Sequence, residues 1–359
     1  MKVLILYCDI GGGHISAAES ISERFEKLDI VCDKKDALDF MPPFKRFILS
    51  DGHSLMYKHF PHIYGLGYRI EELGSNRHFY REYSRYAKVL NEYILKNGYD
   101  TVVCVHVFPA IMVTAVKKQF NTKIESYFVS TDYTCSPSVN QTELDGYFIP
   151  HGLTEEFAKN NIKRNKIVES GIPVKAEYYS QSFKNRAREN LSLPKDKKIA
   201  ILSFGTMGCG PVTRIAKNLA KEHTDLLVCV MCGNNKRLYK KTKRCKTPSV
   251  IPIGFTKQMH EFMAAADLLV SKAGGLTVTE AGTCGIPTVL IDAAPGVETH
   301  NIKYFEKNKL AKSAKSIKDV CKECNILLDN IEEAGEMKNR QRDYFSDNSA
   351  DIIARCVTA

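Results

Sequence analysis

The sequence lacks any apolar run of the ~18–20 residues that a membrane-spanning helix needs. It also offers no signal peptide, because its first apolar stretch, residues 2–8, is short and runs into glycines without a cleavage site. We therefore expect neither a spanning helix nor secretion, while contact with a membrane surface stays open.

Twelve cysteines are present, but the pattern of a disulfide framework or a zinc site is missing. Without a secretory signal a reducing compartment is favoured, so we expect a cytoplasmic protein. Cys229 and Cys232 fall in a predicted strand, where side chains three residues apart point to opposite faces. Cys321 and Cys324 would share a helix face, yet no second pair with zinc spacing accompanies them. We expect no metal site.

The charge is unbalanced: 51 basic residues against 41 acidic ones give a formal net charge of +10. This excess favours an anionic partner, such as nucleotide phosphates, an anionic membrane or nucleic acid. A merely solubilising surface is the alternative, and charge alone does not choose between them.

Strand-like runs alternate with helical ones in two series, which predicts an α/β fold with parallel sheets. At 359 residues two domains are favoured over one. We predict an N-terminal domain over residues 1–172, a polar linker over 173–197 and a second domain over 198–359, whose last helix is free to return to the first domain. Two doubly wound, Rossmann-like domains would then face each other across a cleft. The strands are expected at residues 2–8, 101–107, 124–130 and 146–150, then at 198–203, 225–233, 249–255, 267–273 and 286–292.

Three strand-to-helix turns are rich in glycine: residues 11–14, 203–210 and 271–285. Glycine permits positive φ and close approach, and the start of the following helix attracts phosphate. Close packing of helix on strand explains one such turn, but three in matching positions favour a bound nucleotide. No GxxxxGK[ST] motif occurs, which argues against a P-loop ATPase. A dinucleotide-binding GxGxxG is also disfavoured, because Ser16 stands where its third glycine belongs.

These motifs carry a family resemblance. The stretch "SKAGGLTVTEAGTCGIPTVLIDAAPGVETHNIKYFEKN" (271–308), with "GGGH" (11–14), "STDY" (130–133) and "ESGIPV" (169–174), resembles the processive diacylglycerol glucosyltransferases and the monogalactosyldiacylglycerol synthases. The resemblance implies the GT-B fold and transfer of a sugar from a UDP-sugar to a lipid, with inversion. It implies no cofactor and no essential metal, the UDP-sugar being a substrate.

The resemblance also implies a donor site. Glu280 would accept hydrogen bonds from both ribose hydroxyls, although an acidic residue near a helix start also compensates the helix dipole. The backbone at Phe255 would read the uracil edge. Diphosphate contacts are expected from Gly13, Gly205, Thr206, Met207, Gly274, Gly275, Leu276 and Thr277.

Glu298 and Asn301 match positions that hydrogen-bond the sugar. The family commonly has Gly-Gln-Glu before this point, whereas this chain has Gly296-Val297-Glu298. Valine cannot replace a glutamine amide, so the identity of the sugar stays open, and with it the reaction.

His14 is the candidate base. An imidazole at a helix N-terminus is pushed toward its neutral form, which can accept a proton from an attacking hydroxyl. Asp132 follows a strand and would orient His14, act as the base itself or cap a loop. His106 also ends a strand and is a weaker candidate. For His14 the alternative is a capping role without chemistry.

The segment before the aromatic stripe of residues 79–93 mixes apolar and basic side chains, which suits an anionic membrane interface. The expected lipid-facing residues are Phe44, Lys45, Arg46, Phe47, Ile48 and Lys58. Such mixtures also bind RNA, but no RNA-binding module is evident and we expect no nucleic-acid partner.

The sequence therefore predicts an inverting, UDP-sugar-dependent hexosyltransferase that acts on diacylglycerol or a glycosyl-diacylglycerol. It would work in the cytoplasm as a peripheral protein on the inner face of the cell membrane. Two alternatives remain: a UDP-sugar epimerase of similar fold, and a nucleotide-sugar-sensing protein with degenerate catalysis.

Overall fold

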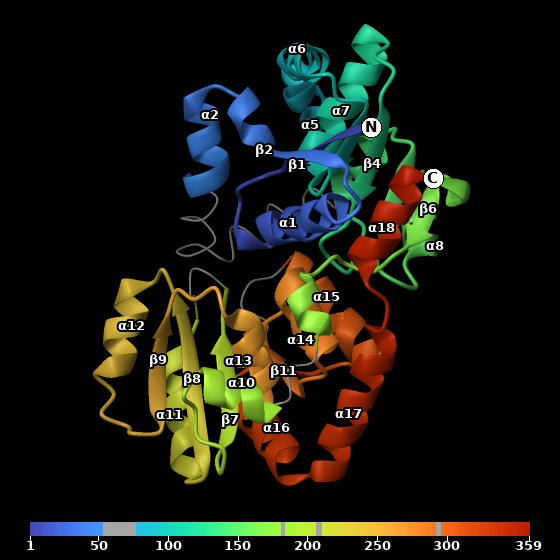
Figure 1. The fold of residues 1–359 in the computed structure, drawn as a ribbon. Coiled ribbons are helices and arrows are strands. Elements are labelled where there is room, and N and C mark those ends of the chain that lie inside the picture. Colours follow the sequence, from blue (N-terminus) through green and yellow to red (C-terminus); the bar gives the residue numbers. More distant parts are fainter. Residues whose placement is uncertain (53–76, 181–183, 206–209, 292–295) are drawn as a thin grey trace. The chain divides into compact units, whose positions relative to one another are not determined.

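The computed structural model describes residues 1–52, 77–180, 184–205, 210–291 and 296–359 and divides the chain into two units. The first comprises residues 1–175, 294–297 and 347–359, and the second comprises 176–293 and 298–346. Each is built on one six-stranded sheet whose paired strands are all parallel. Helices cover both faces of each sheet (Figure 1), which confirms the predicted α/β, doubly wound class.

The first sheet has the strand order β2-β1-β3-β4-β5-β6. Its strands are β1 (Lys2–Tyr7), β2 (Val31–Asp36), β3 (Thr101–Cys104), β4 (Glu125–Val129), β5 (Gly146–Ile149) and β6 (Ile167–Glu169). The helices of this unit are α1 (Gly12–Glu26), α2 (Pro43–Phe47), α5 (Arg77–Tyr83), α6 (Ala87–Asn97), α7 (Val107–Phe120), α8 (Thr154–Lys159) and α18 (Ser349–Thr358).

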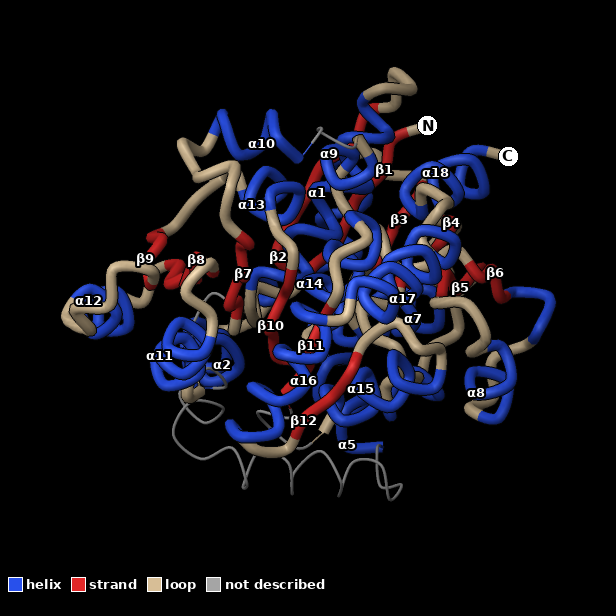
Figure 2. The backbone as a smooth tube through the Cα atoms, turned by 90° about the horizontal axis from the view of Figure 1, so that it is seen from below, coloured by secondary structure: helices blue, strands red, loops and turns tan. Residues whose placement is uncertain are grey.

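The second sheet has the order β12-β11-β10-β7-β8-β9. Its strands are β7 (Lys198–Ser203), β8 (Leu226–Gly233), β9 (Val250–Gly254), β10 (Leu268–Lys272), β11 (Thr288–Ile291) and β12 (Lys312–Ala314). Its helices are α9 (Ala176–Tyr179), α10 (Lys184–Asn190), α11 (Val212–Glu222), α12 (Lys236–Lys243), α13 (Met259–Ala265), α14 (Gly275–Cys284), α15 (Val297–Lys307), α16 (Ile317–Asp329) and α17 (Ile331–Tyr344). In Figure 2 the strands of this sheet form a row, with α11 on one side and α13 on the other.

Continuous apolar runs explain the central strands. Val3, Leu4, Ile5 and Leu6 of β1 are all fully buried, as expected when helices cover both faces of a parallel sheet. The edge strand β2, with the sequence "VCDKKD", was not expected, because its exposed polar side chains leave no apolar run to recognise.

The C-terminal helix α18 packs in the first unit, although it follows α17 of the second in the chain. Ile353, Ala354 and Val357 are buried in the core of the first sheet. Arg24 of α1 forms an ion pair with Asp351 of α18 at 2.7 Å.

The charged stretch 173–197, expected as a linker, contains α9 and α10 and lies, from Ala176 on, in the second unit. Arg188 of α10 is almost fully buried. Its guanidinium donates to the carbonyls of Ala265, Lys195 and Lys197 at 2.9–3.1 Å and to the Asp267 carboxylate at 2.8 Å. Each of the three guanidinium nitrogens thus has a partner, and these hydrogen bonds attach the segment to its unit.

Helix α14 is packed too tightly for a side chain at Gly282, where a Cβ would lie 2.2 Å from Phe345 Cε2. We expect Gly282→Ala to lower the free energy of unfolding by about 1–3 kcal/mol, because the aromatic ring must move. The control is Gly335→Ala on α17, where a Cβ meets nothing within 4 Å, and the better helix propensity should stabilise by roughly 0.5–1 kcal/mol. Urea denaturation measures both, and equal shifts would contradict the packing argument.

Candidate functional site

The carboxyl ends of β1, β3 and β4 bring three polar side chains together in the first unit. His14 lies in the first turn of α1, His106 is the N-cap of α7 and Thr131 follows β4. The rings of His14 and His106 meet edge to face with centroids 4.7 Å apart. Thr131 Oγ1 lies 3.2 Å from His14 Nδ1. Thr131 belongs to the "STDY" motif, but only Asp132 of that motif was predicted to take part in the site.

Two groups contact Nδ1 of His14, the Thr131 hydroxyl and a backbone carbonyl. Its Nδ1 lies 3.2 Å from the carbonyl oxygen of Val105, just after β3. A carbonyl only accepts, so a hydrogen bond to Val105 places the proton on Nδ1, and the neutral ring then carries its lone pair on Nε2. If Thr131 Oγ1 donates to Nδ1 instead, the proton is on Nε2. His14 is half-buried. The arrangement is that of an oriented imidazole whose second nitrogen can accept a proton.

Helix α1 begins without a side-chain cap or an acidic residue in its first turn. Gly11 has φ +117°, a conformation that L side chains rarely adopt, and a Cβ there would meet no protein atom within 4 Å. Gly13 lies within the first helical turn. The first turn therefore offers N–H groups without a competing carboxylate.

Asp132 follows Thr131 at the same strand end and is half-buried. Its backbone carbonyl accepts a hydrogen bond from Ser130 Oγ at 2.9 Å. His106 Nδ1 accepts from the Phe108 N–H at 3.2 Å, so this ring caps α7. His106 was expected to end a strand, but β3 stops at Cys104.

In the second unit the turn from β10 to α14 carries the expected diphosphate contacts. Gly274 is the N-cap of α14, and no side chain caps the helix or places an acid in its first turn. Gly275 and Leu276 are buried, whereas Thr277 is half-buried. Such a helix start is suited to an anion.

Glu280 is only 8% exposed, within α14. It lies beside Tyr178, whose pKa is raised first by burial and then by the Glu280 carboxylate. Burial and Glu280 also raise the pKa of Cys284 to about 12. Tyr178 was missed because it lies in the charged stretch that resembled a linker.

Lys272 is a further residue of this region, and no role was predicted for it from the sequence. It ends β10 and its Nζ contacts Glu298 Oε1 at 2.7 Å. Gly205, with φ +71°, is also close, because a Cβ there would lie 2.9 Å from Lys272 Cε. Its position in the sequence, at the end of a predicted strand and two residues before Gly274, could have identified Lys272 as a residue of this region.

The two residues expected to bind the sugar are held by the protein itself. Glu298 is 5% exposed and pairs with Lys272. Asn301 has no exposed surface, and its Nδ2 donates to the Ala273 carbonyl at 2.8 Å. Both contacts link α15 to the turn between β10 and α14.

Phe255 lies directly after β9 and is 64% exposed, so its side chain is not part of the core. Thr206 and Met207, expected near Gly205, lie outside the described residues. Among the residues that are described, no three His, Cys, Asp or Glu side chains are grouped as ligands of one metal ion would be.

The expected lipid-facing segment is exposed, but its charges are compensated. Phe44, Phe47 and Ile48 are 73%, 60% and 48% exposed. Lys45 pairs with Glu82, and Arg46 pairs with Asp39 and, at 3.6 Å, with Asp36. Lys45 and Arg46 are thus both ion-paired within the first unit. Lys58 lies outside the described residues. Within the described ranges, none of the helices combines the length and apolar character that crossing a bilayer would take.

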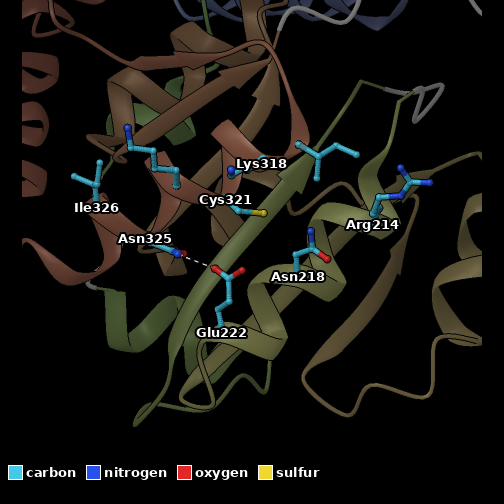
Figure 3. A pocket seen from close by; sticks show the side chains of 9 residues that line it. Arg214, Asn218, Glu222, Lys318, Cys321, Asn325 and Ile326 are labelled. Atoms are coloured by element: carbon cyan, nitrogen blue, oxygen red, sulfur yellow. Dashed lines mark hydrogen bonds between the residues drawn. The ribbon is translucent and has the colours of Figure 1, made fainter.

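A groove of about 640 Å³ runs between α11 and α16 of the second unit (Figure 3). Asn325 Nδ2 donates to Glu222 Oε2 across it at 2.7 Å. Arg214 and Lys318 also line it, but none of the predicted site residues does. The groove is thus separate from the glycine-rich turns.

Comparison with known proteins identifies both parts of the chain. Residues 14–174 match the family model of monogalactosyldiacylglycerol (MGDG) synthase, and residues 211–354 match the glycosyltransferase family 28 C-terminal domain. The processive diacylglycerol beta-glucosyltransferase of Staphylococcus saprophyticus is 27% identical over 313 residues, covering 85% of this chain and 79% of the relative.

Solved structures show the same fold. MurG from Acinetobacter baumannii aligns with a TM-score of 0.66 at 13% identity, over 99% of both chains. UDP-GlcNAc 2-epimerase from Neisseria meningitidis, bound to UDP-GlcNAc, aligns with a TM-score of 0.64 at 12% identity, over the whole of both chains. These likenesses confirm the predicted GT-B fold. Because a transferase and an epimerase share it, the fold alone does not choose the reaction.

The Lys272–Glu298 pair yields a stability prediction. Lys272→Met leaves a buried carboxylate without its cation, and we expect the free energy of unfolding to fall by roughly 2–4 kcal/mol. Adding Glu298→Gln should recover part of this loss, because the uncompensated charge is then gone. Chemical denaturation of the single and double variants measures the coupling. An unchanged unfolding midpoint for Lys272→Met would show that the pair contributes nothing.

Proposed function

We propose that the chain transfers a hexose from a UDP-sugar to diacylglycerol or a glycosyl-diacylglycerol. Residues 14–174 match the model of monogalactosyldiacylglycerol synthase, residues 211–354 match the glycosyltransferase family 28 C-terminal domain, and a processive diacylglycerol beta-glucosyltransferase is 27% identical to the chain. The observation that carries the proposal is on α14. This helix starts at Gly274 and Gly275 without a side-chain cap, and the same helix carries the buried carboxylate of Glu280. The first suits a diphosphate and the second a ribose diol.

The proposed reaction is a single displacement. The acceptor hydroxyl oxygen attacks C1 of the hexose while its proton passes to Nε2 of His14. The bond from C1 to the diphosphate oxygen breaks, and UDP leaves with the electron pair. Backbone N–H groups of Gly275, Leu276 and Thr277 stabilise the charge that develops on the diphosphate.

Asp132 is the second candidate for the base. The contact from His14 Nδ1 to Val105 supports His14, because it leaves the lone pair on Nε2. Asp132 would then orient the acceptor or the imidazole. The reaction as proposed uses the UDP-sugar as a substrate and needs no cofactor. Val297 leaves glucose and galactose both open.

Access to the lipid is proposed to occur through α2, with the protein on the inner, cytoplasmic face of the membrane. Exposing a lipid tail to water costs ~0.8 kcal/mol per CH₂, so the enzyme must meet its acceptor at the bilayer. The exposed Phe44, Phe47 and Ile48 suit insertion among headgroups. Since Lys45 and Arg46 are paired internally, apolar insertion rather than charge carries this contact.

The proposal is tested by turnover. Radiolabelled UDP-glucose and UDP-galactose are incubated with liposomes that contain diacylglycerol, and both label in lipid and released UDP are measured. Glycolipid formed in step with UDP supports transfer, with a chelator expected to have no effect. Recovery of an epimerised UDP-sugar without glycolipid would overturn it in favour of an epimerase, and binding without turnover in favour of a sensor.

The donor assignment predicts that Glu280→Ala weakens UDP binding by roughly 1.5–3 kcal/mol, because hydrogen bonds to a charged group are lost. Calorimetry measures the affinity. Glu332→Ala, at an exposed glutamate of the same unit, is the control and should bind UDP normally. Tyr178→Phe separates a ribose role from a structural one: if it weakens UDP binding as much as Glu280→Ala, the carboxylate acts through Tyr178 and not through the ribose.

The base assignment predicts that His14→Ala lowers the transfer rate by about 10²–10⁴-fold while UDP affinity stays unchanged. Steady-state rates at saturating donor measure this effect. Asp132→Asn, made in parallel, should be the milder variant. If it proves far more damaging than His14→Ala, Asp132 is the base and His14 binds the acceptor.

A further inference from the structure

The largest concentration of charge lies on and after α12 and includes none of the predicted site residues. Residues 236–246, "KRLYKKTKRCK", hold seven Lys and Arg and no Asp or Glu. This segment therefore contributes +7 of the formal +10, and the other residues together only +3. All seven cations are exposed. Within the part of the chain that the structure describes, none of them forms an ion pair.

The neighbouring helix α11 extends this surface. Arg214, Lys217 and Lys221 are exposed and recur at helical spacing, so they share one side of α11. Helices α11 and α12 contact each other and pack on β8. Helix α12 also covers β9, the edge strand of the second sheet (Figure 1). We call these three residues and the seven of residues 236–246 the basic face.

The basic face differs from α2 in ion pairing. Lys45 and Arg46 pair with carboxylates of their own unit, whereas the cations of α12 have no such partner among the described residues. Five of the seven cations lie within α12, and repulsion among like charges destabilises a short helix. A surface that keeps such a cluster of positive charge is complementary to an anionic surface.

We propose that the basic face is a second membrane-contact surface, which binds the headgroups of anionic phospholipids. Clusters of four to eight Lys and Arg near a bilayer are suited to anionic lipid. Tyr239 projects among them with 37% exposure, and a tyrosine suits the level of the headgroups. The choice of a bilayer rests on the proposed function, which places the acceptor there.

A nucleic acid is the other polyanion to consider. Proteins that bind single strands combine basic charge with several aromatic side chains on which bases stack. The segment 236–246 has one aromatic residue, Tyr239, and α11 has none. The face therefore offers charge without a stacking platform, which favours lipid headgroups.

The test compares two variants that lose the same charge. The face variant is K236Q/R237Q/K240Q/K241Q, which keeps the buried Leu238 and Thr242. The control variant is K27Q/K123Q/K159Q/K163Q, at four exposed lysines of the first unit. Both are checked by circular dichroism and UDP binding, and then by sedimentation with vesicles of phosphatidylcholine, with and without phosphatidylglycerol.

We expect the face variant to lose about 10- to 100-fold in affinity for phosphatidylglycerol vesicles, and the control less than about threefold. High salt should remove the difference, because exposed charges are screened. Equal binding by wild type and face variant overturns the proposal, as does an equal loss in the control, since total charge would then be responsible. Loss of polyuridylate binding with vesicle binding intact overturns it in favour of nucleic acid. Vesicle binding needs no turnover, so failure of the transfer assay is a separate result.

Discussion

The parallel order of the strands is the constraint on which both candidate sites depend. All strands of such a sheet end at one edge, where the starts of the following helices also lie. His14 and Thr131 are 117 residues apart in the chain, yet they are in contact because β1, β3 and β4 end together. In the second unit the ends of β7 and β10 bring Gly205 against Lys272 by the same rule. The residues of both candidate sites therefore lie next to the helix starts, where backbone N–H groups are free to bind a ligand.

Buried polar contacts then fix the loops at these edges. Lys272 and Glu298 form an ion pair, and Asn301 donates to Ala273. A buried polar group left without a partner is costly, so each contact restricts the turn to one arrangement. The proposed diphosphate site is consequently held in shape before a donor arrives, which is the condition under which fixed N–H dipoles stabilise developing charge most effectively.

The sequence predicted the fold well where apolar runs and glycines dominate, as in β1 and the turn at Gly274. The sequence did not predict the edge strand β2, whose polar side chains carry no apolar pattern, or the helices α9 and α10 in the stretch 173–197. There the composition resembled a linker, but burial of Arg188 depends on carbonyls and a carboxylate that only the folded unit assembles. The ion pairs of α2 were not predicted for a similar reason: Lys45 meets Glu82 from another helix, and pairing of that kind has no signature in the sequence.

The claim that ties these features together is that one base, His14, activates a hydroxyl for direct attack on the anomeric carbon of a UDP-sugar. The anomeric configuration of the glycolipid tests it most directly. With UDP-α-glucose or UDP-α-galactose as donor, a single displacement inverts C1, and proton NMR of the purified lipid should show only the β-linked sugar. An α-linked product would contradict the account, because retention requires either a covalent intermediate or a front-face attack that His14 as proposed does not provide.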